Sequence, residues 1–306
     1  MTNCRRPATT VIAMARAPKE STTAQPKSTI NAVVKPTTTA RPKVASGAVR
    51  PRTNRAVLGI DVGGSGIKGA PVDLTVGELT KPRLRIETPS PSSPEKCADV
   101  IDAIVKNFAG DIGTGPIGIT YPGVVRDGTT LTAANVDKGW IGRDADAMLE
   151  ERLKRPVTVL NDAQAAVLAE CKFGSAKGVD GLVMMLTFGT GIGSGLAYRG
   201  VALPGIELGH LIMHGRDAEH LAAASIKDKE NLSWKAWAER VNEYLARIEH
   251  MLWPELIIVG GGLSDEPEKF LHRLKTRAPI TTAKLVNGAG IVGAAIAATA
   301  QRNIRK

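Results

Sequence analysis

The chain has 306 residues, a hydrophobic content of 43% and a formal net charge of +10. A chain of this length can hold two lobes of ordinary domain size, each with its own core. Its longest apolar stretches, such as residues 256–259 and 291–300, are too short or too rich in glycine and alanine to cross a bilayer, and the chain begins without a continuous apolar signal core. We therefore expect a cytoplasmic protein with no membrane partner.

The positive charge lies almost entirely in the first 55 residues. They contain eleven Lys or Arg side chains and one acid, Glu20, whereas the remaining 251 residues contain 29 basic and 29 acidic side chains. This segment is rich in Thr, Ala and Pro and lacks aromatic residues and any periodicity, so residues 1–54 are predicted to be a disordered basic tail. An inert tail, a transit peptide and an over-extended start with Met14 as the alternative are all consistent with this composition.

From Ala56 the pattern becomes that of a folded α/β protein. AVLGIDVGG (56–64) predicts a buried strand that enters a glycine turn, and GIKGAPVDL (66–74) a returning strand. CADVIDAIVKNFAG (97–110) has apolar residues at helical spacing, whereas GPIGITYPGVV (115–125) and RPVTVLND (155–162) are typical of buried strands. AQAAVLAECKFG (163–174) predicts a helix that opens directly after Asp162.

The second half repeats this order of elements. GLVMMLTFGTGIGSGLAYRG (181–200) predicts strand, glycine turn and strand, and SWKAWAERVNEYLARIEHML (233–252) a long amphipathic helix. PELIIVGGGLS (254–264) predicts a strand that enters a third glycine turn, and NGAGIVGAAIAATAQR (287–302) a closing helix with small residues on its packing face.

Three glycine turns therefore follow hydrophobic strands, at residues 61–66, 187–195 and 260–262. Glycine lets backbone N–H groups approach an anion closely, so the repeated turns indicate phosphate binding. Residues 64–69 also spell the G-x-G-x-x-G of dinucleotide-binding folds, but Pro71 and a strand-like pattern follow where that fold requires a helix. No segment matches the phosphate loop of P-loop kinases.

Five segments, in this order and spacing, resemble the sugar kinases of the ROK (repressor, open reading frame, kinase) family: GIDVGGSGIKG, NDAQAAVLAE, LTFGTGIGSGL, GIELGHL and LIIVGGGLS. The resemblance covers about residues 56–300. AANVDKGWIG, AEHLAAAS, LSWKAWAERVNEYL and NGAGIVGAA are similar to the branch that uses polyphosphate to phosphorylate glucose. The resemblance implies a two-lobed actin-like or hexokinase-like (ribonuclease H-like) α/β fold. Residues 55–161 would form the N-terminal lobe, completed by the helix at about 288–306, and residues 162–287 the C-terminal lobe.

The resemblance also implies a set of functional residues. Asp162 matches the family's catalytic base toward the sugar 6-hydroxyl, and a helix N-cap is its structural alternative. Independently of the resemblance, Asp61 is predicted to lie inside the first glycine turn, where a carboxylate would repel phosphates unless a cation intervenes, so it would hold Mg²⁺, directly or through water. The remaining positions that match the family's contacts are, for the sugar, Asn135, Asn161, Glu207, His210 and Glu219, and, for donor phosphates or nucleotide, Gly63, Gly64, Ser65, Lys68, Thr187, Gly189, Thr190, Gly191, Gly260, Gly261 and Gly262.

Many ROK proteins carry a zinc-binding cysteine cluster after this histidine, but no cysteine occurs after Cys171 here. We therefore expect no zinc, and we expect His214 and His220 to be surface residues. The other expected partners are glucose, polyphosphate, ATP and a second copy of the chain in a homodimer, with no specific nucleic acid.

Two alternatives remain open at this stage: an ATP-dependent ROK kinase of mannose or an amino sugar, and a ROK-type sugar-responsive regulator. Residues 1–54 contain no pattern of a helix-turn-helix, which disfavours the regulator. Asp265 and Glu266 stand where a polyphosphate-using relative would be expected to carry basic residues, so the preference between polyphosphate and ATP also stays open.

Overall fold

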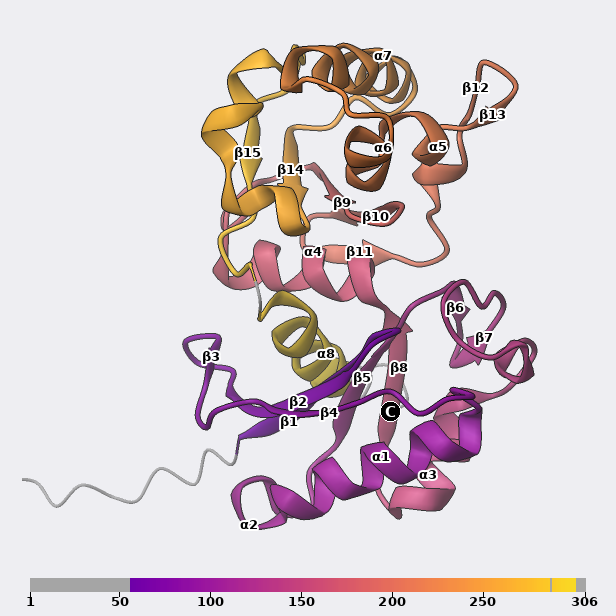
Figure 1. Cartoon of the computed structure of the whole chain (residues 1–306). Coiled ribbons are helices and arrows are strands. Elements are labelled where there is room, and N and C mark those ends of the chain that lie inside the picture. Colours follow the sequence, from indigo (N-terminus) through magenta and orange to yellow (C-terminus); the bar gives the residue numbers. More distant parts are fainter. Residues whose placement is uncertain (1–55, 287, 301–306) are drawn as a thin grey trace, which may run out of the picture. The chain divides into compact units, whose positions relative to one another are not determined.

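The computed structural model describes residues 56–286 and 288–300, which belong to one compact unit. The predicted basic tail, residues 1–54, lies outside the described residues, and so do positions 301–306 of the predicted closing helix. In Figure 1, helices lie between the two larger sheets. None of the described helices combines the length and the hydrophobicity that a membrane crossing requires.

The first sheet has the strand order β3-β2-β1-β5-β8, and β4 pairs with β2 on the same side as β3. Its strands β1, β5 and β8 are parallel, so their carboxyl ends meet at one edge, beside the predicted base at Asp162. β1 and β2 form the predicted strand, glycine turn and strand. The strand bounds are β1 Val57–Val62, β2 Ile67–Asp73, β3 Glu78–Leu79, β4 Leu84–Ile86, β5 Ile117–Tyr121 and β8 Val157–Asn161.

One face of this sheet is covered by α1 (Pro94–Asn107) and α3 (Ala145–Leu153). Ser93 caps α1 by accepting a hydrogen bond from the Lys96 N–H, so this helix begins three residues before the predicted segment. A short helix α2 (Ala109–Ile112) follows it. Between β5 and α3 lie the paired strands β6 (Val125–Arg126) and β7 (Thr129–Thr130) and the 3₁₀ helix η1 (Lys138–Trp140).

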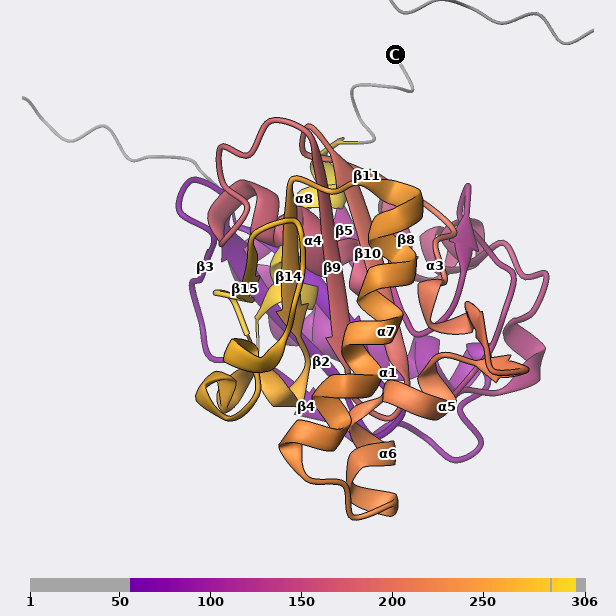
Figure 2. The same ribbon diagram turned by 90° about the horizontal axis from the view of Figure 1, so that it is seen from above.

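The second sheet has the order β11-β10-β9-β14-β15. Side chains of β9 alternate: Met184 and Leu186 pack under α7, whereas Val183 and Met185 point to the opposite face. Figure 2 shows α7 lying along this sheet. The bounds are β9 Leu182–Phe188, β10 Ile192–Tyr198, β11 Val201–Leu203, α7 Trp234–Leu252, β14 Leu256–Gly260 and β15 Ile280–Thr282.

Short elements join the strands of the second sheet. Before α7 they are η2 Leu208–His210, β12 Ile212–Met213, β13 Arg216–Asp217, α5 Glu219–Ala222 and α6 Ala224–Lys229. After β14 they are the 3₁₀ helices η3 Gly262–Asp265, η4 Pro267–Lys269 and η5 Leu271–Arg273. The first group carries several of the predicted sugar-binding residues.

Two helices fill the space between the sheets, α4 (Asp162–Phe173) against β9 and β10, and α8 (Ala289–Ala300) against β1 and β5. Glycines permit their close approach: a Cβ on Gly59 would lie 1.9 Å from the Ile291 carbonyl oxygen, and one on Gly118 1.8 Å from that of Ala294. The helix predicted at the end of the chain thus packs on the first sheet. The division into lobes at residues 161 and 162 stays a prediction.

Candidate active site

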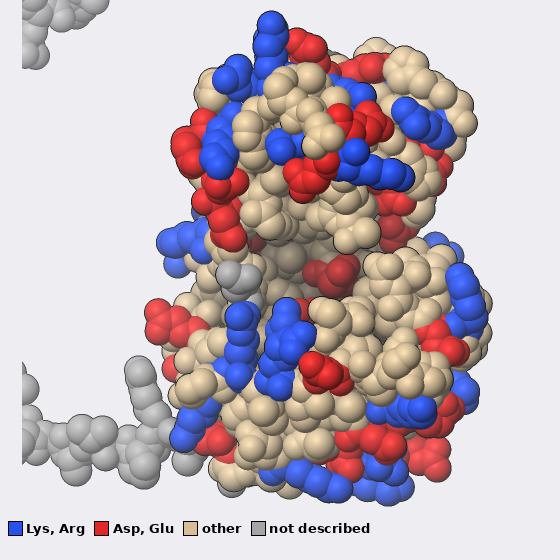
Figure 3. Space-filling model, viewed as in Figure 1, with Lys and Arg blue, Asp and Glu red and all other residues tan. Residues whose placement is uncertain are grey.

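A cavity of about 690 Å³ lies between the two sheets, and the space-filling view shows the hollow with acidic side chains at its floor (Figure 3). It is lined by the loops after β5 and β8, the turn between β9 and β10, and the segment around η2 and α5. Many of the predicted site residues meet here: Asn135, Asn161, Asp162, Thr187, Gly189, Thr190, Gly191, Glu207, His210 and Glu219.

Asp162 is the first residue of α4, directly after β8 ends. The N-cap is Asn161, whose side-chain oxygen accepts a hydrogen bond from the Gln164 N–H at 3.0 Å. One oxygen of the Asp162 carboxylate accepts from the Ala163 N–H at 2.7 Å. Because Asn161 caps the helix, the alternative N-cap role for Asp162 is wrong, and its side chain lines the cavity instead.

Asp162 is exposed to the cavity that it lines, although many protein atoms surround its carboxyl there. Burial raises the pKa of Asp162 to about 6, the bond from the Ala163 N–H opposes that shift, and the nearby charge of Asp61 raises the pKa further. A carboxyl with this pKa is mostly ionised at pH 7 and is a better proton acceptor than an ordinary aspartate. It can therefore act as a general base at neutral pH.

Asp61 lies within β1 rather than in the glycine turn, which corrects the prediction from sequence. Its Oδ1 accepts a hydrogen bond from the buried Thr120 hydroxyl at 2.6 Å. The turn itself closes when Gly63 N–H donates to the Gly66 carbonyl at 3.1 Å. Asp61, Gly63, Gly64, Ser65 and Lys68 do not line the 690 Å³ cavity, but a Cβ on Gly64 would lie 3.3 Å from the Asn135 Cβ, so the turn borders it.

The second glycine turn, between β9 and β10, is held by residues from α5 and α6. Ser225 donates from its N–H to the Gly189 carbonyl at 3.0 Å and from its hydroxyl to the Thr190 carbonyl at 2.7 Å. Glu219 accepts from the Ile192 N–H at 3.2 Å, and a Cβ on Gly191 would lie 2.3 Å from the same carboxylate. Glu219 therefore touches the turn as well as the cavity.

Glu207 immediately precedes η2 and His210 ends it, and both line the cavity. Burial raises the pKa of Glu207, whereas the nearby His210 opposes the shift and the charges of Asp162 and Glu219 add to it. His210 Nδ1 lies 2.8 Å from Asp217 Oδ2, and this hydrogen bond raises the pKa of His210. The Asp217 contact fixes the ring orientation and leaves Nε2 for another partner.

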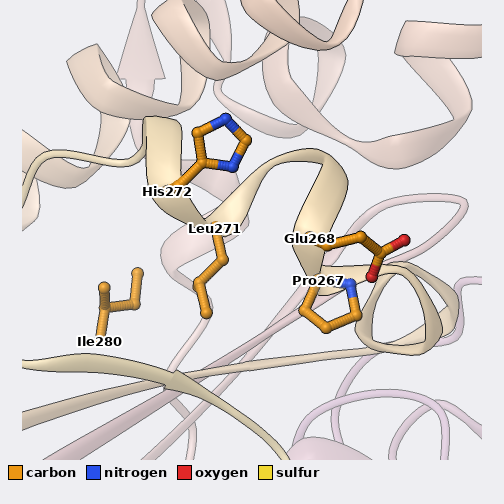
Figure 4. A pocket seen from close by; sticks show the side chains of 5 residues that line it. All are labelled: Pro267, Glu268, Leu271, His272 and Ile280. Carbon is orange, nitrogen blue, oxygen red and sulfur yellow. The ribbon is translucent and has the colours of Figure 1, made fainter.

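The third glycine turn ends β14 and does not line the 690 Å³ cavity. Gly261 has φ +84°, and a Cβ there would lie 2.4 Å from the Phe188 carbonyl oxygen, so the turn packs against the end of β9. A second cavity of about 490 Å³ lies among the short helices that follow and is lined by Pro267, Glu268, Leu271, His272 and Ile280 (Figure 4). No predicted site residue lines it.

The histidines discussed for zinc differ in their surroundings. His214 is exposed and pairs with Glu243 at 2.9 Å, and His220 is also exposed, as predicted. His210, Asp217 and Glu219 place ligand atoms within 4.8 Å of one another, but no thiolate is among them. The expectation of no zinc stays a prediction.

Two residues of this site escaped the sequence analysis. Thr120, which holds Asp61, could have been found by pairing the carboxyl end of β5 with that of β1. Asp217, which holds His210, lies seven residues further along the chain, in a small hairpin formed by β12 and β13 that no periodicity predicted.

Two sheets lie on either side of α4 and α8, and glycine turns follow the carboxyl ends of strands. A carboxylate with a raised pKa lines the cavity between the sheets. These features define an actin-like sugar kinase fold. The chain belongs to the ROK family, which it matches over residues 57–225.

A relative from Mycobacterium tuberculosis, named polyphosphate glucokinase, is 48% identical over 249 residues, covering 81% of this chain and 93% of the relative. The crystal structure of an inorganic polyphosphate/ATP-glucomannokinase from Arthrobacter sp. strain KM has a TM-score of 0.76 at 44% identity, covering 81% of this chain and all of that one. A ROK family glucokinase from Streptomyces griseus, in complex with glucose and AMPPNP, has a TM-score of 0.69 at 26% identity, covering 80% and 99%.

Proposed function

We propose that the protein is a polyphosphate- and ATP-dependent glucokinase, which transfers a phosphoryl group to the 6-hydroxyl of glucose. The observation that carries this proposal is the Asp162 carboxyl, which faces the cavity with a pKa raised to about 6. The similarity to relatives with that named activity supports the same reaction over a sugar-responsive regulator. Mannose is a second candidate substrate, since one structural relative is named a glucomannokinase.

In the proposed mechanism Asp162 accepts the proton of the 6-hydroxyl as that oxygen attacks the terminal phosphorus of the donor, and the remainder of the donor leaves. Asn135, Asn161, Glu207, His210 and Glu219 would hold the other sugar hydroxyls, because all five line the same cavity. Planar amide and carboxylate groups suit pairs of ring hydroxyls. The N–H groups of Thr190 and Gly191 would face the transferring phosphate, whereas the Gly189 N–H donates to the Gly191 carbonyl at 3.0 Å and shapes the turn.

The oxygen ligands available beside Asp61 are of the kind that Mg²⁺ prefers. Asp61 offers a half-buried carboxylate at the carboxyl end of β1, and its charge raises the pKa of Asp162. A cation beside Asp61 would therefore offset the repulsion between these two carboxylates and a donor phosphate. One or two carboxylates together with substrate phosphates are a typical Mg²⁺ environment. When bound, the ion would offset negative charge on the phosphoryl group. Gly63, Gly64, Ser65 and Lys68 would hold the same phosphates, and Gly260, Gly261 and Gly262 an adenosine moiety.

The test is a matrix of sugars and donors with purified protein. Glucose, mannose and N-acetylmannosamine are each combined with ATP or polyphosphate, and the sugar 6-phosphate is quantified. We expect glucose 6-phosphate with both donors. Loss of activity with EDTA and its recovery with Mg²⁺, but no loss with a zinc-selective chelator, would support the metal assignment. Transfer to an amino sugar and not to glucose would contradict the proposal.

We also expect the protein to be a homodimer in the cytoplasm. Size-exclusion chromatography with light scattering can test its oligomeric state.

A further inference from the structure

A row of polar side chains crosses the first sheet at the level of Asp61. The strand register places Thr120 on β5 opposite Asp61 on β1, Asp61 opposite Lys68 on β2, and Lys68 opposite Arg85 on β4. Residues directly opposite one another share a face of the sheet. The row therefore runs from Asp61, the residue expected to hold Mg²⁺, to the adjacent cations Lys68 and Arg85. The sequence analysis did not assign Arg85 to phosphate binding.

This row lies on the face that carries α8. Gly59 shares a face with Asp61, and a Cβ on Gly59 would meet the Ile291 carbonyl oxygen of α8. A Cβ on Gly290, in the first turn of α8, would lie 3.2 Å from Asp61 Oδ1. The row thus begins beside the amino end of α8, where the helix dipole favours anions.

Arg85 also contacts the first glycine turn. Its Nη2 donates to the Ser65 carbonyl at 2.8 Å, and a Cβ on Gly66 would lie 2.6 to 2.8 Å from guanidinium atoms. Glycine at position 66 is therefore what lets the guanidinium lie over the turn. This contact fixes one end of the guanidinium and leaves its other N–H groups for an anion.

Lys68 and Arg85 place two positive charges on neighbouring strands. Like charges directly opposite one another in a sheet are destabilising. Among the residues that the structure describes, neither Lys68 nor Arg85 forms an ion pair with a carboxylate. Figure 3 shows Lys and Arg side chains gathered on the first-sheet side of the hollow. An anion that spans the two side chains would offset their repulsion.

We propose that Lys68 and Arg85 bind the polyphosphate chain beyond the phosphate that is transferred, with Arg85 setting the preference for a long chain. Adjacent strands lie about 4.8 Å apart, so the row reaches roughly 10 Å from Asp61 to Arg85. The triphosphate of ATP shares this chemistry but is followed by an uncharged ribose, whereas polyphosphate continues as phosphates along the row. Arg85 is exposed, so the site stays open at the end away from Asp61.

This inference rests on the proposed function, because it assigns a donor site in the same kinase. The test uses the full chain with the substitutions Arg85→Ala and Arg85→Lys. Arg152→Ala is the matched control, since Arg152 is an exposed arginine on α3, on the opposite side of the first sheet, where it pairs with Asp99. Steady-state kinetics are measured at saturating glucose with ATP, tripolyphosphate and long-chain polyphosphate, and direct binding of polyphosphate is measured without glucose at low and high salt.

For Arg85→Ala we expect the KM for long-chain polyphosphate to rise about tenfold, as for the loss of one charge-assisted contact, with kcat within about twofold. The loss should be smaller with tripolyphosphate and about two- to threefold with ATP. Arg85→Lys should recover part of the affinity, and Arg152→Ala should match wild type. Equal losses with ATP and long-chain polyphosphate, or unchanged polyphosphate binding in Arg85→Ala, would overturn the assignment.

The binding measurement separates this inference from the proposed function. If the wild-type chain transferred no phosphate from polyphosphate, the proposed donor would be wrong. A loss of polyphosphate binding in Arg85→Ala would still support the anion site. Unchanged polyphosphate binding in this variant would exclude the anion site.

Discussion

The acid limb of the pH profile tests the assignment of Asp162 as the base. Only the carboxylate form accepts a proton, so activity is lost as the pH falls through its pKa, which burial and the charge of Asp61 raise to about 6. At pH 5 about one carboxyl in eleven would then be ionised, and kcat/KM for glucose should be about tenfold below its plateau. An aspartate with the ordinary pKa of about 3.9 would still be more than nine-tenths ionised at that pH.

The assay is kcat/KM for glucose at a fixed saturating donor between pH 4.5 and 8. Asp61→Asn provides an internal comparison, because removing its charge should move the acid limb to lower pH even though overall activity falls. Glu243→Gln removes a partly exposed carboxylate on α7, outside the cavity, and should leave the limb in place. Since the donor is the same throughout, its own ionisation cannot produce a difference between variants. A limb near pH 4 in wild type, or an unmoved limb in Asp61→Asn, would show that a carboxyl with this raised pKa does not control the reaction.

Three further substitutions have defined outcomes. Asp162→Asn should lower kcat by at least about a hundredfold and leave glucose affinity, measured by calorimetry, within a few fold; retention of more than a tenth of the turnover would exclude it as the base. Asp217→Asn should lower the pKa of His210 and raise the KM for glucose about tenfold with an unchanged KM for the donor, and Asp217→Glu should recover part of the effect. Glu170→Ala should lower the free energy of unfolding in urea by about 3 kcal/mol or more, because the buried Glu170 carboxylate accepts from the N–H groups of Ser175, Lys284 and Leu285; a change below about 1 kcal/mol would contradict this.

Local pattern was enough to predict the main strands and helices. The apolar runs that became β1, β9 and β14 each end at glycines, and the amphipathic segment that became α7 begins at its Ser233 N-cap. Short edge strands such as β4 and β15 were missed, because two or three residues of extended chain carry no periodicity.

The contacts that depend on long-range register could not be predicted in the same way. Arg85 lies 20 residues from Ser65 in sequence, and only the pairing of β2 with β4 brings its guanidinium over the first glycine turn. Asp61 lies on β1 and Asp162 directly follows β8, so the raised pKa of the base depends on how β1, β5 and β8 align. The residue types were visible in the sequence, whereas their mutual positions were not.

Transfer of phosphate from polyphosphate to glucose through Asp162 can be tested directly with ³²P-labelled polyphosphate. Purified full chain is incubated with the labelled polymer, glucose and Mg²⁺ in the absence of nucleotides, and the label in glucose 6-phosphate is followed over time. We expect steady transfer by the wild-type chain and at least about a hundredfold slower transfer by Asp162→Asn. An absence of label in glucose 6-phosphate with the wild-type chain, or equal labelling with both chains, would contradict this expectation.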